Sequence, residues 1–405
     1  MSLTEHSGFR VGGPRPLTTS DDLRRSNAAS VLRAILVGGP LARAELAERL
    51  GMTRATVTRV AGQLVEAGLL REGKPRRSSP GRPLVPLELA GSERLALSVH
   101  IGAIELRIGL VNIRGEVLLE NRYSYSGREP SQVAEVISRG VDEVASLVPA
   151  TATLLGISAS VGGWVDISGE LVVQYEPLGW KDVPLGSILP EIGLPRYFDQ
   201  LVRGLALAES MYGVARGATD FLELWSGAVL GASLMEDGAV RRGPRGGAGG
   251  IDHFPTRFSG IICSCGRDDC LFSVASDGAL TEAAISAGIL RAGGSLRTLI
   301  NIAADGDEQA IALLHERATA AGEAAAVMAD LLGPGLLVIA GLVTTSPGYQ
   351  EAFERGFRER AGQGTITPVV TSMFGDLAPT VASAAILLDA YFHNPLAFEK
   401  SLTVD

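Results

Sequence analysis

The sequence of 405 residues contains little lysine, little cysteine and no long hydrophobic segment. Its only lysines are Lys74, Lys181 and Lys400, so arginine carries nearly all of the positive charge. The longest apolar run, residues 331–343, is interrupted by Gly333-Pro334-Gly335 and is too short for a membrane span. The N-terminus is polar and has no signal-peptide core. These absences predict a cytoplasmic protein without a membrane segment.

The charges are distributed unevenly along the chain. Residues 1–90 carry 14 Lys and Arg against 8 Asp and Glu, whereas residues 91–405 carry 22 against 37. A basic N-terminal part on an acidic body is typical of a nucleic-acid-binding module attached to a second unit. A basic surface that is merely solvated is the alternative. A length of 405 residues favours two or three domains in total.

The N-terminal part has the pattern of a winged helix-turn-helix. Residues 1–20 are rich in Gly, Pro, Ser and Thr and predict a flexible arm. Within residues 21–90, apolar residues recur at helical spacing in three segments, and a hairpin follows. The expected helices are 21–38, 43–50 and 54–67, and the expected strands are 69–72 and 84–89. This order predicts a DNA-binding domain over residues 21–90.

The third helix and the wing supply the candidate DNA contacts. The N-terminal end of the third helix, which reaches base edges in the major groove, exposes one polar face. The candidate residues there are Thr53, Arg54, Thr56, Thr58 and Arg59. The wing adds Arg76, Arg77 and Arg82, which suit phosphates or a narrow minor groove. The alternative is a small helical packing domain with a solvated arginine face.

All three cysteines lie within eight residues, at positions 263, 265 and 270. His253 precedes Cys263 by ten residues. Three thiolates and one imidazole form the ligand set of a closed structural Zn²⁺ site, so His253, Cys263, Cys265 and Cys270 are the candidate ligands. The alternative is three unrelated buried thiols and a core histidine. The odd cysteine count disfavours a disulfide framework.

The remainder of the chain alternates strands and helices, which predicts an α/β body. The expected strands are 95–99, 105–112, 116–125, 154–160, 336–339 and 368–373. The expected helices are 130–147, 276–287, 307–332, 347–360 and 380–391.

The spacing His-x9-Cys-x-Cys-Gly-x3-Cys, preceded by the glycine-rich run 246–250, resembles the signature of the ROK family of repressors, open reading frames and sugar kinases. Gly81-Arg82-Pro83 is similar to the wing of its repressors. The resemblance implies two actin-like, ribonuclease-H-like lobes, with a zinc knuckle bracing the sugar side of the cleft. Lobe one would span about 91–198 plus a C-terminal helix at about 380–400, and lobe two about 199–379.

The resemblance also implies that kinase chemistry has been lost. The family's Asp-x-Gly-x-Thr phosphate loop falls on residues 100–104, with His100 for the aspartate and Ile104 for the threonine. The catalytic aspartate falls on Leu201, which cannot accept a proton. Asp199, two residues earlier, is the candidate for a shifted base. Two further nucleotide loops fall on residues 227–229 and 340–342 and have lost their small residues.

The sugar-contacting positions are also altered. The sugar-binding asparagine falls on Gln200, and two sugar-contacting glutamates fall on Gly250 and Phe272. Gln200 and His253 remain as candidate effector contacts, because the family's motif histidine touches both metal and sugar. The resemblance therefore implies a homodimeric or tetrameric repressor, not an enzyme, which binds an inverted-repeat operator and senses a sugar or another small molecule. The alternatives are a sugar kinase and a regulator that no longer binds a sugar.

Overall fold

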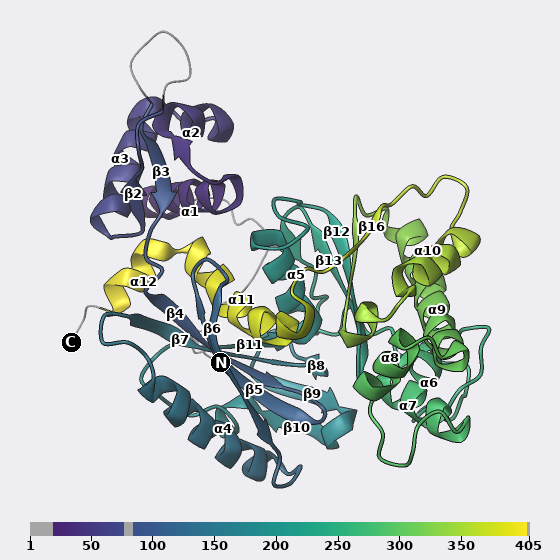
Figure 1. The fold of residues 1–405 in the computed structure, drawn as a ribbon. Coiled ribbons are helices and arrows are strands. Elements are labelled where there is room, and N and C mark those ends of the chain that lie inside the picture. The colour runs from purple at the N-terminus through teal and green to yellow at the C-terminus, as the bar shows by residue number, and fades with distance from the viewer. Residues whose placement is uncertain (1–18, 77–83, 403–405) are drawn as a thin grey trace, which may run out of the picture.

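A computed structural model of the chain describes residues 19–76 and 84–402 (Figure 1). Most of the expected arm, and the wing residues Arg77 and Arg82, lie outside the described residues. The helix-turn-helix part lies at the top of Figure 1, one lobe lies below it and the second lobe lies beside that one. No helix in the described ranges is long and apolar enough to cross a membrane.

The N-terminal part is a winged helix-turn-helix. Its helices are α1 (Ser20–Gly38), α2 (Arg43–Leu50) and α3 (Arg54–Glu66), and its strands are β1 (Leu41–Ala42), β2 (Leu70–Glu72) and β3 (Pro86–Leu89). The strands form a sheet in the order β1-β3-β2. Thr19 caps α1 through the backbone N–H of Asp22, at 3.1 Å, so α1 starts just ahead of the expected Asp21. Gly51, with φ of 62°, makes the turn between α2 and α3.

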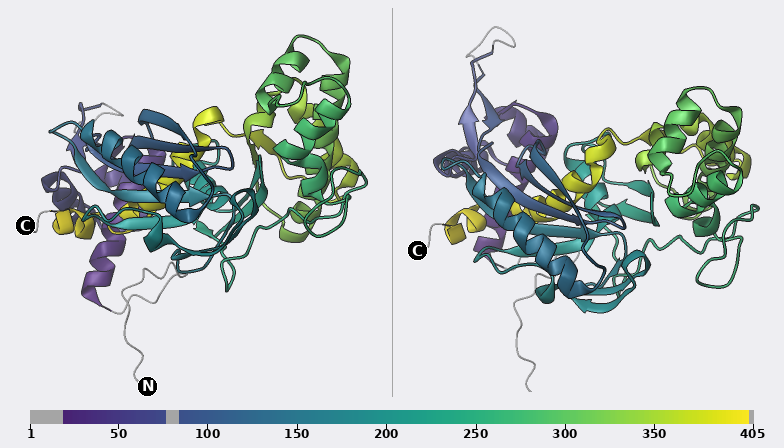
Figure 2. Two further views of the ribbon diagram at one scale, coloured as in Figure 1. Left: turned by 90° about the horizontal axis from the view of Figure 1, so that it is seen from below. Right: turned by 60° about the horizontal axis from the view of Figure 1, so that its bottom comes forward.

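Lobe one is built on a five-stranded sheet in the order β11-β7-β4-β5-β6. These strands are β4 (Arg94–Ile101), β5 (Glu105–Asn112), β6 (Val117–Ser124), β7 (Thr153–Val161) and β11 (Arg196–Gln200). Alternate residues of β4 enter two different cores, one beneath α4 (Pro130–Ser146) and one beneath α11 (Ala378–His393). The two helices therefore cover opposite faces of this sheet (Figures 1 and 2). Strand β11 ends at Gln200, two residues beyond the expected end of lobe one.

A small sheet in the order β10-β9-β8 follows β7, and the sequence patterns do not predict it. Its strands are β8 (Trp164–Val165), β9 (Leu171–Tyr175) and β10 (Trp180–Pro184), with the short 3-10 helices η1 (Glu176–Leu178) and η2 (Leu185–Ser187) nearby. The strands are short and joined by tight turns, so hydrophobic alternation over them is too brief to be read from sequence.

Lobe two is built on a second five-stranded sheet, β14-β13-β12-β15-β16. Its strands are β12 (Phe221–Ser226), β13 (Leu230–Glu236), β14 (Ala239–Val240), β15 (Leu337–Ala340) and β16 (Val369–Thr371). Its helices are α6 (Leu271–Ala275), α7 (Asp277–Ser286), α8 (Leu296–Ala304), α9 (Glu308–Leu332) and α10 (Tyr349–Arg360). The 3-10 helices are η3 (Leu342–Thr345) and η4 (Gly375–Leu377). The sequence patterns missed α6 and α8.

Helix α5 (Leu201–Met211) packs against α11 and against β12 and β13, so it links the two lobes. The two helices approach closely because Gly204 has no side chain: a Cβ there would lie 2.4 Å from the carbonyl oxygen of Ala382. The predicted α/β class, with a helix-turn-helix followed by two lobes, is confirmed.

The helix-turn-helix part is packed onto the body. Its buried residues belong to the same hydrophobic core as residues of α5 and α11. Arg33 of α1 pairs with Asp389 of α11 at 3.0 Å. The Arg94 guanidinium pairs with Glu399 of α12 (Pro395–Leu402) at 2.7 Å and donates to the carbonyl of Ala67 at 2.7 Å. These contacts fix the orientation of the helix-turn-helix part relative to the body.

Two glutamates, Glu209 of α5 and Glu223 of β12, are fully buried beneath the sheet of lobe two. Neither carboxylate oxygen of Glu223 has a hydrogen-bond partner in the described part of the chain. Burial, and then the nearby Glu209, raises the pKa of Glu223 well above its usual range. Burial also raises the pKa of Glu209. Glu223 is therefore protonated in the folded protein well above the pH at which it ionises in the unfolded chain.

Glu223→Gln should stabilise the protein at alkaline pH. A raised pKa favours folding below the unfolded-state pKa, and this contribution is lost as pH rises through the folded-state pKa. Each unit by which the pKa is raised costs about 1.4 kcal/mol, and this cost accumulates from the unfolded-state pKa up to the folded-state pKa. Denaturant unfolding should therefore show a larger gain for the variant at pH 8 than at pH 5. The exposed Glu236→Gln on β13 is the control, and equal gains at both pH values would contradict the burial argument.

Candidate functional site

Helix α3 presents the candidate base-contacting face. The Thr53 hydroxyl caps the helix by accepting from the backbone N–H of Thr56 at 3.1 Å, and it lies 2.9 Å from the Thr56 hydroxyl. The Thr58 hydroxyl donates to the carbonyl of Arg54 at 2.8 Å. These three hydroxyls are thus engaged within the helix. Arg54 and Arg59 are exposed and form no ion pair with any described residue, so their guanidiniums are free to meet DNA.

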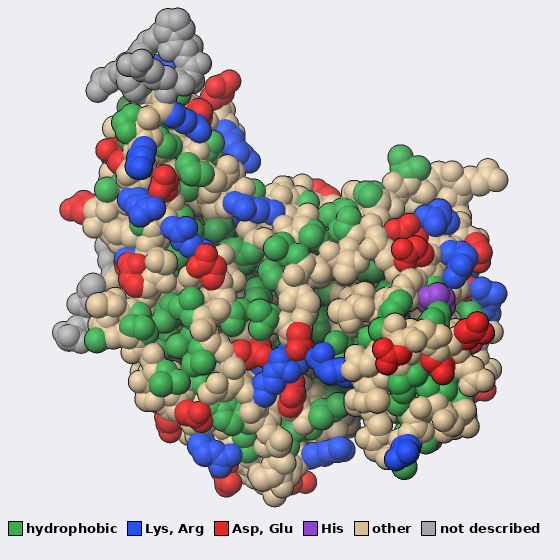
Figure 3. Space-filling model, viewed as in Figure 1, with side chains coloured by type: hydrophobic (Ala, Val, Ile, Leu, Met, Phe, Trp, Pro, Cys, Tyr) green, Lys and Arg blue, Asp and Glu red, His purple; other side chains and the backbone are tan. Residues whose placement is uncertain are grey.

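The wing residue Arg76 lies at the start of the hairpin loop and pairs with Glu45 of α2 at 2.6 Å. Both side chains are substantially exposed, and an exposed pair of this kind contributes about 0–1 kcal/mol, so a phosphate can displace it. Figure 3 shows Lys and Arg side chains on the visible face of the helix-turn-helix part, at the upper left.

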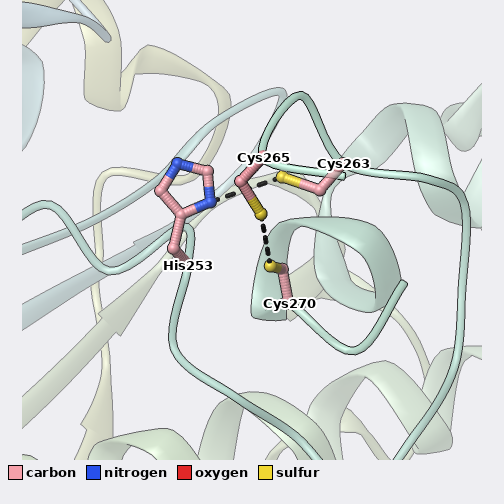
Figure 4. Close-up of side chains that lie close together, drawn as sticks. All are labelled: His253, Cys263, Cys265 and Cys270. Atoms are coloured by element: carbon pink, nitrogen blue, oxygen red, sulfur yellow. Dashed lines mark hydrogen bonds between the residues drawn. The ribbon is translucent and has the colours of Figure 1, made fainter. Parts of the chain in front are cut away.

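His253, Cys263, Cys265 and Cys270 form a cluster in the segment between β14 and α6 (Figure 4). Their donor atoms all lie within 4.8 Å of one another. His253 Nδ1 lies 3.3 Å from Cys263 Sγ, and Cys265 Sγ lies 3.3 Å from Cys270 Sγ. Gly266, with φ of 86°, turns the chain between the second and third cysteines. The structure thus brings the four predicted ligands together, and this donor set fits a metal ion that prefers nitrogen and sulfur.

The cysteine loop also touches lobe one. The Ser264 hydroxyl donates to the Glu176 carboxylate of η1 at 3.0 Å. Arg267 donates to the backbone carbonyl of His253 at 2.7 Å, which ties the two ends of the cluster together. The cysteine loop therefore contacts both lobes.

The resemblance aligns His100 and Ile104 with the family's first phosphate loop. His100 is buried, and its Nδ1 lies 3.0 Å from the Ser160 hydroxyl, which lies 2.7 Å from that of Ser383 on α11. Burial, and then Arg107, lowers the pKa of His100 to about 3, so its imidazole is neutral. Ile104 is 81% exposed beside the β4–β5 turn. Neither residue offers an anionic oxygen for Mg²⁺ or a hydroxyl for phosphate.

Leu201, which the resemblance aligns with the catalytic aspartate, lies in an apolar cluster. Leu201 packs with Leu205 of α5, Ala340 of β15, and Ala378 and Ala382 of α11. Leu201 and Ala340 therefore belong to one small hydrophobic core. The resemblance aligns Leu201 with the catalytic aspartate and Ala340 with the third nucleotide loop.

Asp199, the candidate for a shifted base, is held by two arginines. It is 4% exposed and accepts from Arg203 at 2.9 Å and from Arg242 at 2.7 Å. The backbone N–H of Gln200 also donates to it, at 2.8 Å. Both of its carboxylate oxygens are thus engaged by guanidiniums.

Gln200 and Arg203 lie at the start of α5, and the side chain of Gln200 is largely buried. No hydrogen bond in the described structure joins Gln200 to His253, the two expected effector residues. Arg203 and Arg242 were not among the predicted site residues. The resemblance offers one signal, because it aligns residues 200–203 with the family run Asn-Asp-Ala-Asn, so Arg203 replaces the final asparagine.

Comparison with protein families assigns both parts of the chain. The ROK family model matches residues 96–390, and a MarR family model matches residues 21–78. The chain belongs to the ROK family. A transcriptional regulator of Mycobacterium tuberculosis is 31% identical to it, over 95% of this chain and 90% of the relative. The DNA-binding transcriptional dual regulator NagC of Escherichia coli is 25% identical, over 82% of this chain and 84% of NagC.

Solved structures give the same family. A ROK family transcriptional regulator, a homologue of the Escherichia coli MLC protein, has a TM-score of 0.77 at 26% identity and covers 94% of this chain and 99% of its own. A ROK family glucokinase from Streptomyces griseus, in complex with glucose and AMPPNP, has a TM-score of 0.62 at 22% identity, over 72% of this chain and 98% of its own. The kinase shares the fold of the two lobes, whereas the regulator matches nearly the whole chain.

Proposed function

We propose that this ROK protein is a transcriptional repressor whose kinase-like body has become a dimerisation and effector-sensing unit. The observation that carries this proposal is a recognition helix, α3, mounted on a body in which Leu201 and Ala340 form an apolar cluster at the base position. The relatives named as transcriptional regulators support it, since they match the helix-turn-helix part as well as the body.

Operator binding would use two copies of the chain. One winged helix reads only a short half-site, so tight specific binding needs two helices on one duplex. Residues 91–405, with 22 Lys and Arg against 37 Asp and Glu, repel DNA, so a dimer formed through the bodies must point its α3 helices outward. The target is then an inverted repeat with half-sites separated by whole helical turns. Base edges would be contacted by Arg54 and Arg59. The phosphate backbone of the DNA would be contacted by Arg76, Arg77 and Arg82.

We assign structural Zn²⁺ to the cluster of His253, Cys263, Cys265 and Cys270. Four protein ligands close the tetrahedral shell, which leaves no position for a substrate or a reactive water. Through Ser264 and Glu176 the ion would stabilise the contact between the lobes.

A sugar kinase is the second candidate, since the glucokinase shares the fold of the lobes. His100, Ile104 and Leu201 argue against it, because each replaces a group that phosphoryl transfer needs. A body that dimerises without sensing any ligand is the other alternative.

Phosphorylation of sugars should be undetectable with this protein. A coupled assay with ATP across hexoses and amino sugars is expected to show no turnover above background, against about 1–100 per second for typical kinases. Leu201→Asp should not restore activity, because His100 and Ile104 still leave the phosphates unheld. Turnover in the kinase range by the unmodified protein would overturn the assignment.

The repressor proposal is tested by selecting bound duplexes from a random DNA pool with the full-length protein. An enriched inverted repeat supports it, and the position of that repeat within genomic promoters shows whether binding would block transcription. A pool that remains random after repeated rounds contradicts it. Release of the selected duplex by candidate ligands then tests effector sensing.

A further inference from the structure

A pocket of about 290 Å³ lies between the helix-turn-helix part and the body, which meet above lobe one in Figure 1. Residues of α1 and β3 line it from the helix-turn-helix part, and the β5–β6 turn and the end of α5 line it from the body. Among its described lining residues, none is a position that the resemblance aligns with the nucleotide or sugar sites. This junction pocket is therefore separate from the kinase-like site.

Two arginines of the body, Arg114 and Arg216, line the junction pocket. Arg114 Nη2 donates to the carbonyl of Leu89, at the end of β3, at 2.5 Å, and Arg216 Nη2 donates to the carbonyl of Leu36 in α1. The Leu36 carbonyl lies in the last turn of α1, where carbonyls lack partners within the helix, so Arg216 acts as a C-terminal cap. Both arginines are exposed, and neither forms an ion pair in the described part of the chain. Each guanidinium has five donors, so each can also serve a ligand in the pocket.

The two carboxylates in the lining do not cancel this positive charge. Glu88 is already paired with Arg71, at 3.0 Å. Glu116 accepts from the side-chain amide of Asn112 at 2.7 Å and has no ion pair among the described residues. The lining thus holds two arginines without a carboxylate partner against one glutamate without a cation partner. A ligand with one negative charge is favoured, and the fork of a guanidinium matches a carboxylate group.

The remaining lining is largely apolar. The buried side chains of Ile35, Leu36 and Met211 contribute to it, together with the half-buried Tyr212. Apolar surface of this kind favours a ligand with an apolar body. The volume of about 290 Å³ is about ten times the share of liquid volume of one water molecule, so the pocket admits about ten non-hydrogen atoms.

We propose that the junction pocket binds a small carboxylate with an apolar body, and that its occupancy weakens operator binding. The carboxylate would accept from Arg114 and Arg216, and the apolar body would lie against the side chains of α1 and α5. The regulatory half of this proposal rests on the proposed function, because it assumes that the helix-turn-helix part binds an operator.

The link to DNA follows from what the two arginines hold. A charged acceptor forms a stronger hydrogen bond with a guanidinium than a neutral carbonyl does, so a bound carboxylate competes with the carbonyls of Leu89 and Leu36. Both carbonyls belong to the helix-turn-helix part, whose orientation would then be less fixed. Two recognition helices on one duplex need a fixed geometry, so the ligand and the operator oppose each other, and each weakens the other by the same factor.

Calorimetric titration of the full-length protein tests the site in the absence of DNA. The probes are phenylacetate, hexanoate, phenylacetamide and acetate, each to about 10 mM, where a ligand of millimolar affinity occupies most sites. At least one of phenylacetate and hexanoate should bind. Phenylacetamide lacks the charge and acetate lacks the apolar body, so both should bind at least tenfold more weakly. No binding by phenylacetate or hexanoate, or equal binding by either control, would overturn the site.

Arg216→Gln should weaken binding of the carboxylate probe at least tenfold, because it removes one of the two cations. Arg355→Gln, on an exposed position of α10, is the matched control and should leave the affinity unchanged. Equal affinities of these two variants would contradict the role of Arg216.

Glu116→Gln should change the affinity in the opposite direction. It removes the lining carboxylate that has no cation partner in the described structure, and a glutamine oxygen can still accept from Asn112. The carboxylate probe should therefore bind at least twofold more tightly, a gain that loss of folding cannot produce. Asp142→Asn on the exposed face of α4 is the control. No gain for Glu116→Gln relative to this control would contradict the charge argument.

Fluorescence anisotropy with the selected duplex separates this proposal from the proposed function. A saturating carboxylate probe should weaken duplex binding at least threefold, and Arg216→Gln should lose this response. A protein that selects a duplex but binds neither carboxylate contradicts the junction site alone. A probe that binds without changing duplex affinity contradicts the regulatory half. A protein that binds the probe but no duplex selectively contradicts the repressor assignment itself.

Discussion

Cys265→Ser should deplete the protein of metal and lower the unfolding temperature of lobe two. Cys265 is exposed, so replacing its sulfur with oxygen removes almost no packing and would be nearly neutral if the thiol were free. As a zinc ligand, however, it contributes to a binding free energy that reaches about 10–16 kcal/mol in zinc-finger peptides and is coupled to folding. A large effect from an exposed side chain is therefore specific to metal ligation.

Metal analysis of protein purified without chelator should find one Zn²⁺ per chain in the unmodified protein and far less in the Cys265→Ser variant. Asp268→Ala is the matched control, because it changes an exposed side chain of the same loop and keeps all four ligands. Thermal unfolding should separate the two variants by several degrees, since about 1 kcal/mol shifts the Tm of a large domain by about 2–4 °C. An unmodified protein with well under one equivalent of metal, or two variants with the same Tm, would exclude the zinc site.

Arg54→Ala and Arg59→Ala should each weaken operator binding by about 1–3 kcal/mol if the side chain pairs with guanine, and should relax specificity at one base position. The reason is that both guanidiniums are exposed on α3, at the end of the helix that enters the major groove. Fluorescence anisotropy with the selected duplex and single-base variants measures both effects. Arg355→Ala, an exposed arginine of α10 on the body, removes the same charge and should change neither affinity nor specificity.

The complex should contain two chains on one inverted repeat, and its affinity should fall steeply with salt because several phosphates are neutralised. Each phosphate contact adds about one unit to the slope of log affinity against log salt. The intact chain is the right material, because the helix-turn-helix part shares its core with α5 and α11 and would expose that core if excised. A single chain bound to one half-site, with no preference between an inverted repeat and its half, would contradict the dimer.

Much of the local structure is determined by the sequence alone. Thr53 caps α3 and the apolar residues of this helix recur at its period, so its start and its buried face follow from a few neighbouring residues. The cysteine cluster is equally local, because its four ligands lie within 18 residues and Gly266 supplies the turn. These features depend on short-range spacing, which sequence patterns record directly.

Only the tertiary structure decided the features that join distant segments. Arg94 pairs with Glu399 across 305 residues, and Arg203 and Arg242 meet at Asp199 although the two arginines lie on different elements. The same holds for the apolar cluster of Leu201 and Ala340 and for the buried carboxyls of Glu209 and Glu223. No periodicity or capping rule links such residues, because their contacts arise only when sheets and helices pack together. The sequence thus determines helix α3 and the cluster of His253 and the three cysteines, whereas the contacts of Asp199 with its two arginines and the attachment of the helix-turn-helix part follow from packing.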